Sequence, residues 1–167
     1  MSEARELTAR IRPVRPADLP RVWEMVRSLA EFERMTDILT GTRERLHDLV
    51  FGAAPAMFGQ VAEGADRQLV GYALYHFTYS SFRTNPRMWL EDLFVEESAR
   101  GTGTGEALVR AFVADALARG CHRVDWHVLD WNPARAFYER LGARASGDGM
   151  IQYGLDLPGM NRLLERS

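Results

Sequence analysis

The stretch from Met88 to Arg119 constrains the fold more than any other part of this sequence. It opens with a strand-like apolar run, passes through a glycine-rich turn at 100–105 and ends in an amphipathic pattern with helical period. The helix expected over 103–119 presents one apolar face, made of Leu108, Val109, Phe112, Val113, Ala116 and Leu117. A strand and a helix joined in this way are typical of a domain in which helices pack on a central sheet.

Periodicity and turn residues predict further elements on both sides of this stretch. We expect strands at 9–15, 56–63, 68–79, 88–95, 122–129 and 150–157, and further helices at 18–33, 42–51 and 132–141. Asp18 is expected to cap the first of these helices. The sequence therefore predicts one mixed α/β domain over residues 1–167, built around one central sheet.

Composition excludes several classes of protein. The net charge is −2, whereas nucleic-acid-binding domains usually carry a clear basic excess. A single cysteine allows no intrachain disulfide and favours the reducing cytoplasm. No apolar run reaches the length of a membrane span, and the charged N-terminus does not resemble a secretory signal. The four histidines show no metal-ligand spacing, so we expect no metal site.

The glycine-rich turn has the properties of a phosphate-binding loop. Glycines let backbone amides approach an anion closely, and the following helix begins with unpaired N–H groups. The turn lacks the Lys-Ser/Thr pair of a Walker A loop and does not fit GxGxxG. On its own the pattern leaves two possibilities open, a pyrophosphate site or a plain connector.

Two adjacent carboxylates, Glu91 and Asp92, lie inside the apolar run. In a regular strand Glu91 would share a face with Trp89, Leu93 and Val95, and Asp92 with Leu90 and Phe94. If both faces are covered, at least one acid is partly desolvated, and burial raises the pKa of a carboxyl group toward neutrality. Such a group can accept a proton from an alkyl ammonium, and its negative charge attracts that cation.

The motif Arg100-x-x-Gly103-x-Gly105 resembles the [Q/R]-x-x-G-x-[G/A] motif of the GNAT superfamily of N-acetyltransferases. Blocks from SLAEFERM (28–35) to FYERLGA (137–143), with LEDLFV (90–95) the most specific, resemble the diamine (spermidine/spermine) and thialysine acetyltransferase branch. The resemblance implies a GNAT fold with a mixed, mostly antiparallel sheet of six to seven strands and about four helices. It also implies a cytoplasmic homodimer that uses acetyl-CoA as co-substrate.

The resemblance further implies the residues of the site. The acetyl-CoA contacts would be Leu93, Phe94 and Val95 along a bulged strand, the loop Arg100, Gly101, Thr102, Gly103, Thr104, Gly105 and Glu106, and Asn132, Pro133, Ala134 and Phe137. The amine contacts would be Phe32, Glu33, Glu91, Asp92 and Asp148. We assign Glu91 as base and substrate ligand. For Asp92 a structural hydrogen bond is the stronger expectation.

Tyr138 is the expected general acid, because the family uses the tyrosine of this FY pair to protonate the leaving thiolate. Asn132-Pro133 reads as a helix cap followed by proline at the first helical position. Asn132 lies six residues before Tyr138, one fewer than is usual in the family, which alters the expected contact of Asn132, Pro133 and Ala134 with the pantetheine arm.

The sequence thus predicts acetyl transfer from acetyl-CoA to a primary amine by direct attack in a ternary complex, with a diamine or polyamine favoured. One alternative is a thialysine or amino-acid acetyltransferase. Its substrate carboxylate would need an arginine, and Arg34 and Arg83 are candidates. A second alternative, of another class, is a non-catalytic module that senses acyl-CoA.

Overall fold

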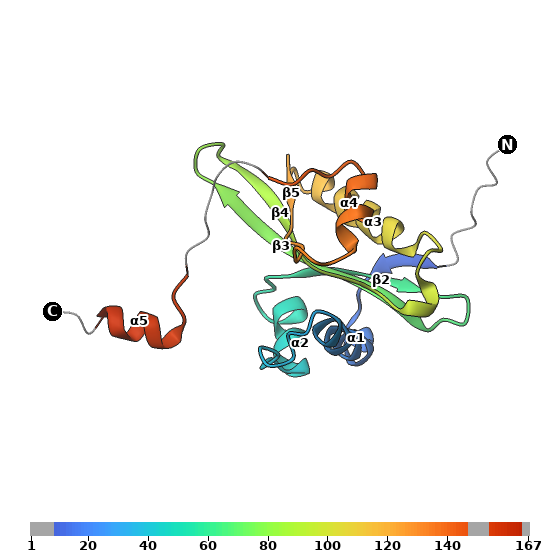
Figure 1. Cartoon of the computed structure of the whole chain (residues 1–167), viewed down its shortest axis with the longest axis horizontal. Helices are drawn as coiled ribbons and strands as arrows, with labels where there is room; N and C mark the ends of the chain where they lie inside the picture. The colour runs from blue at the N-terminus through green and yellow to red at the C-terminus, as the bar shows by residue number, and fades with distance from the viewer. Residues whose placement is uncertain (1–8, 147–153, 165–167) are drawn as a thin grey trace. The chain divides into compact units, whose positions relative to one another are not determined.

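The structure is a computed structural model that describes residues 9–146 and 154–164. The described chain forms two units, one ending at Pro133 and the other beginning at Ala134. The first unit contains the sheet and three of the helices (Figure 1).

The sheet of the first unit is a meander with a parallel strand added at one edge. Its strands are β1 (Arg10–Pro13), β2 (Phe58–Glu63), β3 (Leu69–Ser80), β4 (Asn85–Val95) and β5 (Val124–Asp125). They lie side by side in chain order, with β1 to β4 antiparallel and β5 parallel to β4. The mixed, mostly antiparallel sheet was predicted correctly, whereas the described residues form five strands rather than six or seven.

Helices cover both faces of this sheet (Figure 1). On one face lie α1 (Leu19–Phe32) and α2 (Arg43–Phe51), and on the other lies α3 (Thr104–Ala118). Two short 3₁₀ turns, Pro16–Asp18 and Glu97–Ala99, precede α1 and α3. The Thr42 hydroxyl accepts a hydrogen bond from the Arg45 amide at 3.2 Å, so this residue caps α2.

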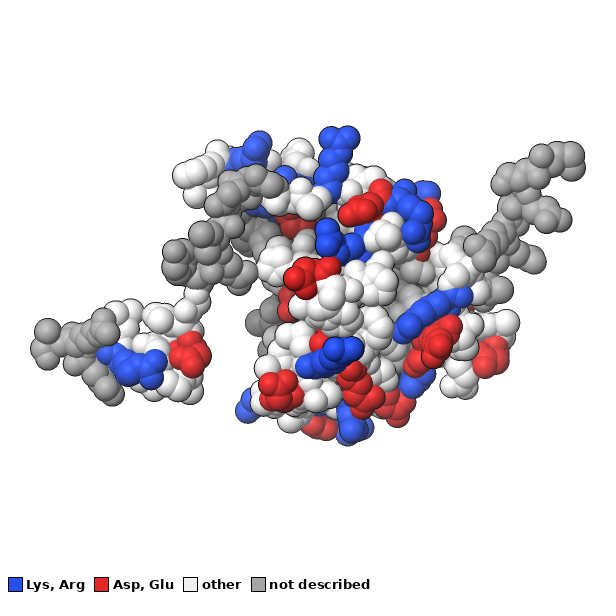
Figure 2. All heavy atoms as spheres, viewed as in Figure 1, with Lys and Arg blue, Asp and Glu red and all other residues white. Residues whose placement is uncertain are grey.

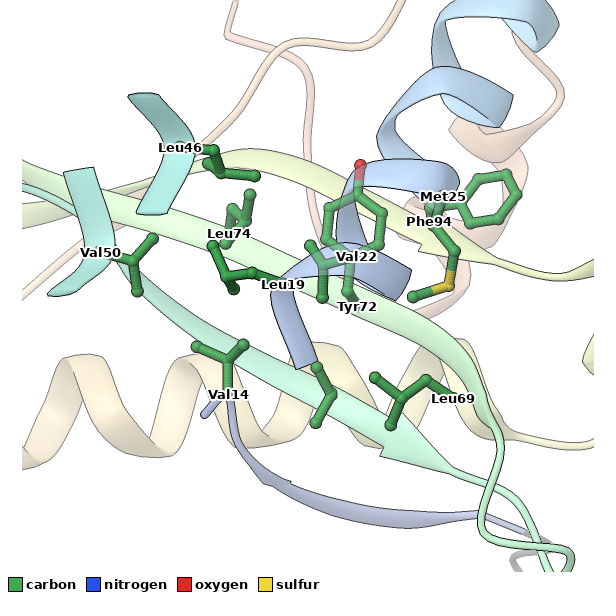
Figure 3. Close-up of a cluster of buried hydrophobic side chains, with 11 residues drawn as sticks. Val14, Leu19, Val22, Met25, Leu46, Val50, Leu69, Tyr72, Leu74 and Phe94 are labelled. Carbon is green, nitrogen blue, oxygen red and sulfur yellow. The ribbon is translucent and has the colours of Figure 1, made fainter. Parts of the chain in front are cut away.

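Each face of the sheet has its own apolar core. The α1–α2 face buries Val14, Leu19, Val22, Met25, Leu46, Val50, Val61, Leu69, Tyr72, Leu74 and Phe94, and Figure 3 shows Tyr72 standing between Leu74 and Phe94. The α3 face buries Ala9, Ala62, Ala73, Tyr75, Met88, Leu90, Leu108, Phe112, Ala116 and Cys121. Residues of β3 alternate between the two cores, with Leu74 in the first and Ala73 and Tyr75 in the second. The face of a β4 side chain therefore follows from the β3 residue that lies opposite it.

Two local predictions were wrong, and a third falls partly outside the described residues. Asp18 precedes α1 but does not cap it, because its carboxylate instead accepts from the Arg15 amide at 2.7 Å and pairs with Arg12 at 2.7 Å. The strand expected at 122–129 is only Val124–Asp125, since the chain leaves β4 after two paired residues. The last expected strand begins outside the described residues, and its described end is not a strand.

The second unit contains α4 (Ala134–Arg140) and α5 (Leu157–Leu164). The helix expected at 132–141 is α4, which begins two residues after Asn132, the expected cap. None of the helices in the described ranges has the length and apolarity needed to cross a membrane. Acidic and basic side chains are interleaved over the visible face in Figure 2.

Candidate active site

A β-bulge at Glu91 sets the geometry of the acidic pair. Opposite β3, Leu74 pairs with Asp92 and Tyr75 pairs with Leu90, so Glu91 is the extra residue between them. The expected alternation was therefore wrong. Leu90 shares the α3 face with Leu93, because the bulge shifts the faces by one residue before Asp92.

Both carboxylates consequently reach the α1–α2 face. Asp92 lies opposite Leu74, whose side chain belongs to the core of that face. The carboxylate of Glu91 lies 3.4 Å from His76, which alternates with the α3-facing Tyr75 and so shares the face of Leu74. A bulge thus gathers on one face two acids that a regular strand would separate.

Asp92 is the acid whose proton affinity is most altered. Burial, followed by the negative charge of Glu91, raises the pKa of Asp92 to about 7. A hydrogen bond of 3.4 Å from the Tyr72 hydroxyl acts in the opposite direction, and the charge of Glu33 raises this pKa further. The sequence predicted that one acid of the pair would be desolvated, and the structure identifies it as Asp92, held by a tyrosine side chain.

Glu33, at the end of α1, belongs to the same acidic group. Burial raises the pKa of Glu33 itself, and its charge acts on both Tyr72 and Asp92. The pKa of Tyr72 is raised well above its ordinary value, first by burial and then by the charge of Asp92. Three carboxylates, Glu33, Glu91 and Asp92, thus meet on one face, an arrangement that favours a bound cation.

His76 forms the outer side of this acidic group. Its Nδ1 lies 3.1 Å from the Phe77 carbonyl oxygen, which can only accept a hydrogen bond. With Nδ1 donating, Nε2 carries a hydrogen only in the imidazolium form. The contact with Glu91, which is about half exposed with a side-chain exposure of 51%, is therefore an ion pair only when His76 is protonated.

Aromatic rings flank the acidic group at the end of α1. The rings of Phe32 and Trp131 lie 6.0 Å apart, and the guanidinium of Arg34 lies over the Trp131 ring at 5.5 Å. Phe32 was predicted as a substrate contact. Trp131 is 48% exposed, so its ring lies at the surface beside Phe32.

One edge of β4 is open beside this group. Within the described chain, β5 pairs with β4 only at Met88 and Trp89, whereas β4 continues to Val95. Leu93, Phe94 and Val95, the residues predicted to pair with an acyl-CoA arm, lie in this unpaired part. The Val95 carbonyl accepts a hydrogen bond from Arg100 Nε at 2.9 Å, so that acceptor is already used.

The glycine-rich loop has the backbone that its sequence predicts. Gly101 and Gly103 have φ angles of 72° and 92°, which residues other than glycine rarely adopt. The Thr102 hydroxyl donates to the Ala99 carbonyl at 2.7 Å and lies 2.9 Å from the hydroxyl of buried Thr104, so these side chains fix the loop. Apart from Gly101 and its two chain neighbours, no atom of the described chain lies within 4 Å of a Cβ placed at Gly101.

This loop fits a phosphate group. The space beside Gly101 is open, and α3 begins at Thr104 without a side-chain cap on its first amides. Gly105 and Glu106 lie in the first turn of α3, where Glu106 pairs with Arg110 at 2.8 Å. The Arg100 guanidinium instead lies over the rings of Phe32 and Phe94, at 5.5 and 5.9 Å.

The remaining predicted residues fall at the boundary of the units or beyond it. Asn132 is buried, and its backbone N–H donates to the Leu129 carbonyl at 2.9 Å. Pro133 ends the first unit. Ala134 starts α4, which also carries the neighbouring rings of Phe137 and Tyr138, with centroids 5.0 Å apart. Asp148 lies outside the described residues.

Sequence reasoning missed Tyr72 and His76. Both lie on β3, and they meet Asp92 and Glu91 only through the pairing register of β3 and β4. For His76 the signal in the sequence was a run of polar and aromatic residues, YHFTYSSF (75–82), at the end of the expected strand, whereas Tyr72 lies before that run. That signal does not specify the register on which both contacts depend.

Comparison with known proteins connects this geometry with a family. Residues 23–143 match the family model of the acetyltransferase (GNAT) family. A thialysine N-epsilon-acetyltransferase of Mus musculus is 32% identical over 169 residues, which cover 95% of this chain and 99% of that protein. A spermidine/spermine N(1)-acetyltransferase-like protein of Homo sapiens is 31% identical over 140 residues, which cover 80% of this chain and 20% of that protein.

A solved structure shows the same fold. An integron cassette protein of V. cholerae superposes with a TM-score of 0.74 at 25% identity, covering 95% of this chain and 98% of that one. The fold, the loop and the acidic group therefore occur together in a chain whose relatives carry the names of acetyltransferases.

Proposed function

Because this chain belongs to the acetyltransferase (GNAT) family and is an N-acetyltransferase, we propose that it transfers an acetyl group from acetyl-CoA to a primary amine of a small cationic substrate. The observation that carries the proposal is the gathering of Glu33, Glu91 and Asp92 on one face, with the pKa of Asp92 at about 7. Acids so placed attract an ammonium group and can take its proton.

The loop and the open strand edge account for the acyl donor. In the proposal the amides at Gly101 and Gly103 and the start of α3 hold the pyrophosphate, and the edge from Leu93 to Val95 faces the pantetheine arm. The donor supplies a thioester carbonyl and a thiolate leaving group. The glycine φ angles and the open space beside Gly101 support this assignment.

Proton transfer is assigned to the acidic pair. An alkyl ammonium has a pKa of about 10.4, and only the neutral amine attacks a thioester. The sequence favoured Glu91 as base, and the pKa of Asp92 supports Asp92 as the member that titrates near neutrality. The amine nitrogen then bonds to the carbonyl carbon and loses its second proton, and the carbon–sulfur bond breaks. Tyr138 donates its phenol proton to the thiolate and regains one from solvent, which takes up the proton released by the nitrogen.

The acceptor belongs to one of two substrate classes. The sequence favoured a diamine or polyamine, and a relative carries the name spermidine/spermine acetyltransferase-like. The alternative is a thialysine or amino-acid substrate, and another relative carries that name. The acidic group supports any small cation and does not separate the two classes. A homodimer stays a prediction.

Release of the CoA thiol would test the proposal, with putrescine, spermidine, spermine, thialysine, lysine and a peptide N-terminus as acceptors. Tyr138→Phe should reduce kcat at least about a hundredfold, the range typical of a general acid. Tyr79→Phe, on the exposed hairpin between β3 and β4, is the matched control and should leave kcat unchanged. Saturable acetyl-CoA binding without turnover of any amine would favour a sensor module instead.

A further inference from the structure

Arg34 lies in a backbone conformation that arginine rarely adopts. Its φ is 58°, in the left-handed region, at the point where α1 ends. The Met35 amide donates to the Ala30 carbonyl at 2.8 Å and the Arg34 amide to the Glu31 carbonyl at 3.1 Å, the pattern that closes a helix. Glycine is the usual residue at such a position, and a side chain there costs roughly 1–2 kcal/mol.

Two opposite charges, those of Glu33 and Arg34, follow each other directly at the end of α1. Glu33 lies with Tyr72 and Asp92 in the acidic group, whereas the Arg34 guanidinium lies over the exposed Trp131 ring at 5.5 Å. Trp131 also contacts Phe32, so the ring links the guanidinium to the wall of the acidic group.

Among the described residues, the Arg34 guanidinium contacts an aromatic ring but forms no ion pair. No carboxylate there lies within ion-pair distance of its guanidinium. The neighbouring Glu33 has a raised pKa caused by burial, the opposite of what a paired guanidinium would produce. The Arg34 guanidinium and the acidic group thus lie near the same pair of rings, Phe32 and Trp131, without forming an ion pair.

We propose that Arg34 determines specificity by binding the carboxylate of an amino-acid substrate whose terminal amine enters the acidic group. The inference rests on the proposed acetyl transfer and selects one of its two acceptor classes. A guanidinium offers parallel N–H donors that match the two oxygens of a carboxylate. The other arginine considered from the sequence, Arg83, lies in the turn of the β3–β4 hairpin, without such neighbours among the described contacts.

Lysine and cadaverine provide a matched pair of substrates, because cadaverine is lysine without its carboxylate. We expect the wild-type protein to have a higher kcat/KM for lysine than for cadaverine. Arg34→Gly should lower the lysine-to-cadaverine ratio of kcat/KM by about tenfold to a hundredfold, the usual effect of losing a charged hydrogen bond. The change should appear mainly in the KM for lysine, and Arg34→Lys should restore part of it.

The choice of glycine at position 34 and a matched control variant together exclude a folding artefact. Glycine adopts φ near 58° without strain, so the variant keeps the helix ending while losing the guanidinium. Arg67→Gly is the matched control, because Arg67 is also an exposed arginine with positive φ, 65°, but lies in the turn between β2 and β3. Arg67→Gly should leave the lysine-to-cadaverine ratio unchanged.

Calorimetric binding of lysine and cadaverine in the presence of CoA keeps this inference separate from the proposed function. An unchanged ratio in Arg34→Gly, with turnover retained, would overturn the role of Arg34 alone. Absence of turnover with every amine would overturn the proposed function, and the binding measurement would still decide the carboxylate site. Equal affinity of wild type and Arg34→Gly for lysine would contradict the proposal that Arg34 binds the substrate carboxylate.

Discussion

At the scale of single residues, Asp92 makes the sharpest prediction. Its pKa of about 7 means that the carboxylate form, which can accept a proton, accumulates as pH rises through 7. We expect kcat/KM to rise with pH up to about 7 and then level off, and this rising limb to disappear in Asp92→Asn. If kcat/KM of Asp92→Asn rises with pH in the same way as that of wild type, another group causes the pH dependence.

The same shift predicts how stability depends on pH. Because the folded pKa of Asp92 lies above its ordinary value, Asp92 contributes stability at low pH that is lost as pH rises through about 7. Between pH 4 and 7 wild type should therefore lose on the order of 4 kcal/mol at most relative to Asp92→Asn. Denaturant unfolding of both proteins at several pH values measures this difference.

Single residues also show which parts of the candidate site could be predicted from the sequence. Phe32 and Glu33 were predicted as site residues, and the structure places them at the end of α1, with Glu33 acting on Asp92. Tyr72 and His76 were not predicted, because their roles depend on which residues of β4 they oppose. A linear pattern gives the face of a regular strand but does not give the partner across it.

At the scale of elements, the bulge in β4 can be tested by deletion. Removing Glu91 joins Leu90 to Asp92, and each keeps its face because Glu91 is the unpaired residue. We expect the deletion variant to retain cooperative unfolding and the pairing of β3 with β4, while losing activity because the acidic pair and the bulge are gone. Circular dichroism with denaturant, beside the amine assay, measures both outcomes.

Two variants serve as comparisons for this deletion. Glu91→Ala removes the carboxylate and keeps the bulge, so it separates the charge from the backbone. Deleting Asp92 instead also removes the bulge and places Glu91 opposite Leu74, so Leu93 and Val95 keep their face and the sheet should be about as stable as in the Glu91 deletion. A loss of cooperative unfolding in both deletions would contradict the assignment of one extra residue at this point of β4.

Most elements could be predicted because their apolar residues recur with helical or strand period. The helices at 18–33, 42–51 and 103–119 match α1, α2 and α3, and four strands match β1 to β4. The resemblance implied a bulge in this strand, but periodicity could not place it at Glu91, because one added residue in a long strand leaves hydrophobic runs on both sides. The shortness of β5 was missed for a similar reason, since its apolar run continues after pairing ends.

At the scale of the whole molecule, the proposed acyl donor should stabilise the fold. A ligand at a hundred times its Kd adds about 2.7 kcal/mol, which raises the Tm of a protein of this size by about 5–10 °C. Thermal unfolding with increasing acetyl-CoA measures this shift, and adenosine, which lacks the pyrophosphate, should produce much less. No shift at millimolar acetyl-CoA would contradict the assignment of the loop around Gly101.

The order of the strands has a consequence for how the molecule is made. Because β1 to β4 pair with their neighbours in sequence, the α1–α2 core is composed entirely of residues up to Phe94. A chain emerging from the ribosome can therefore close this core, and bring Glu33 near Asp92, while the glycine loop is still inside the exit tunnel. The face proposed to receive the amine thus forms first, and the loop proposed to hold the acyl donor is added to a surface already formed.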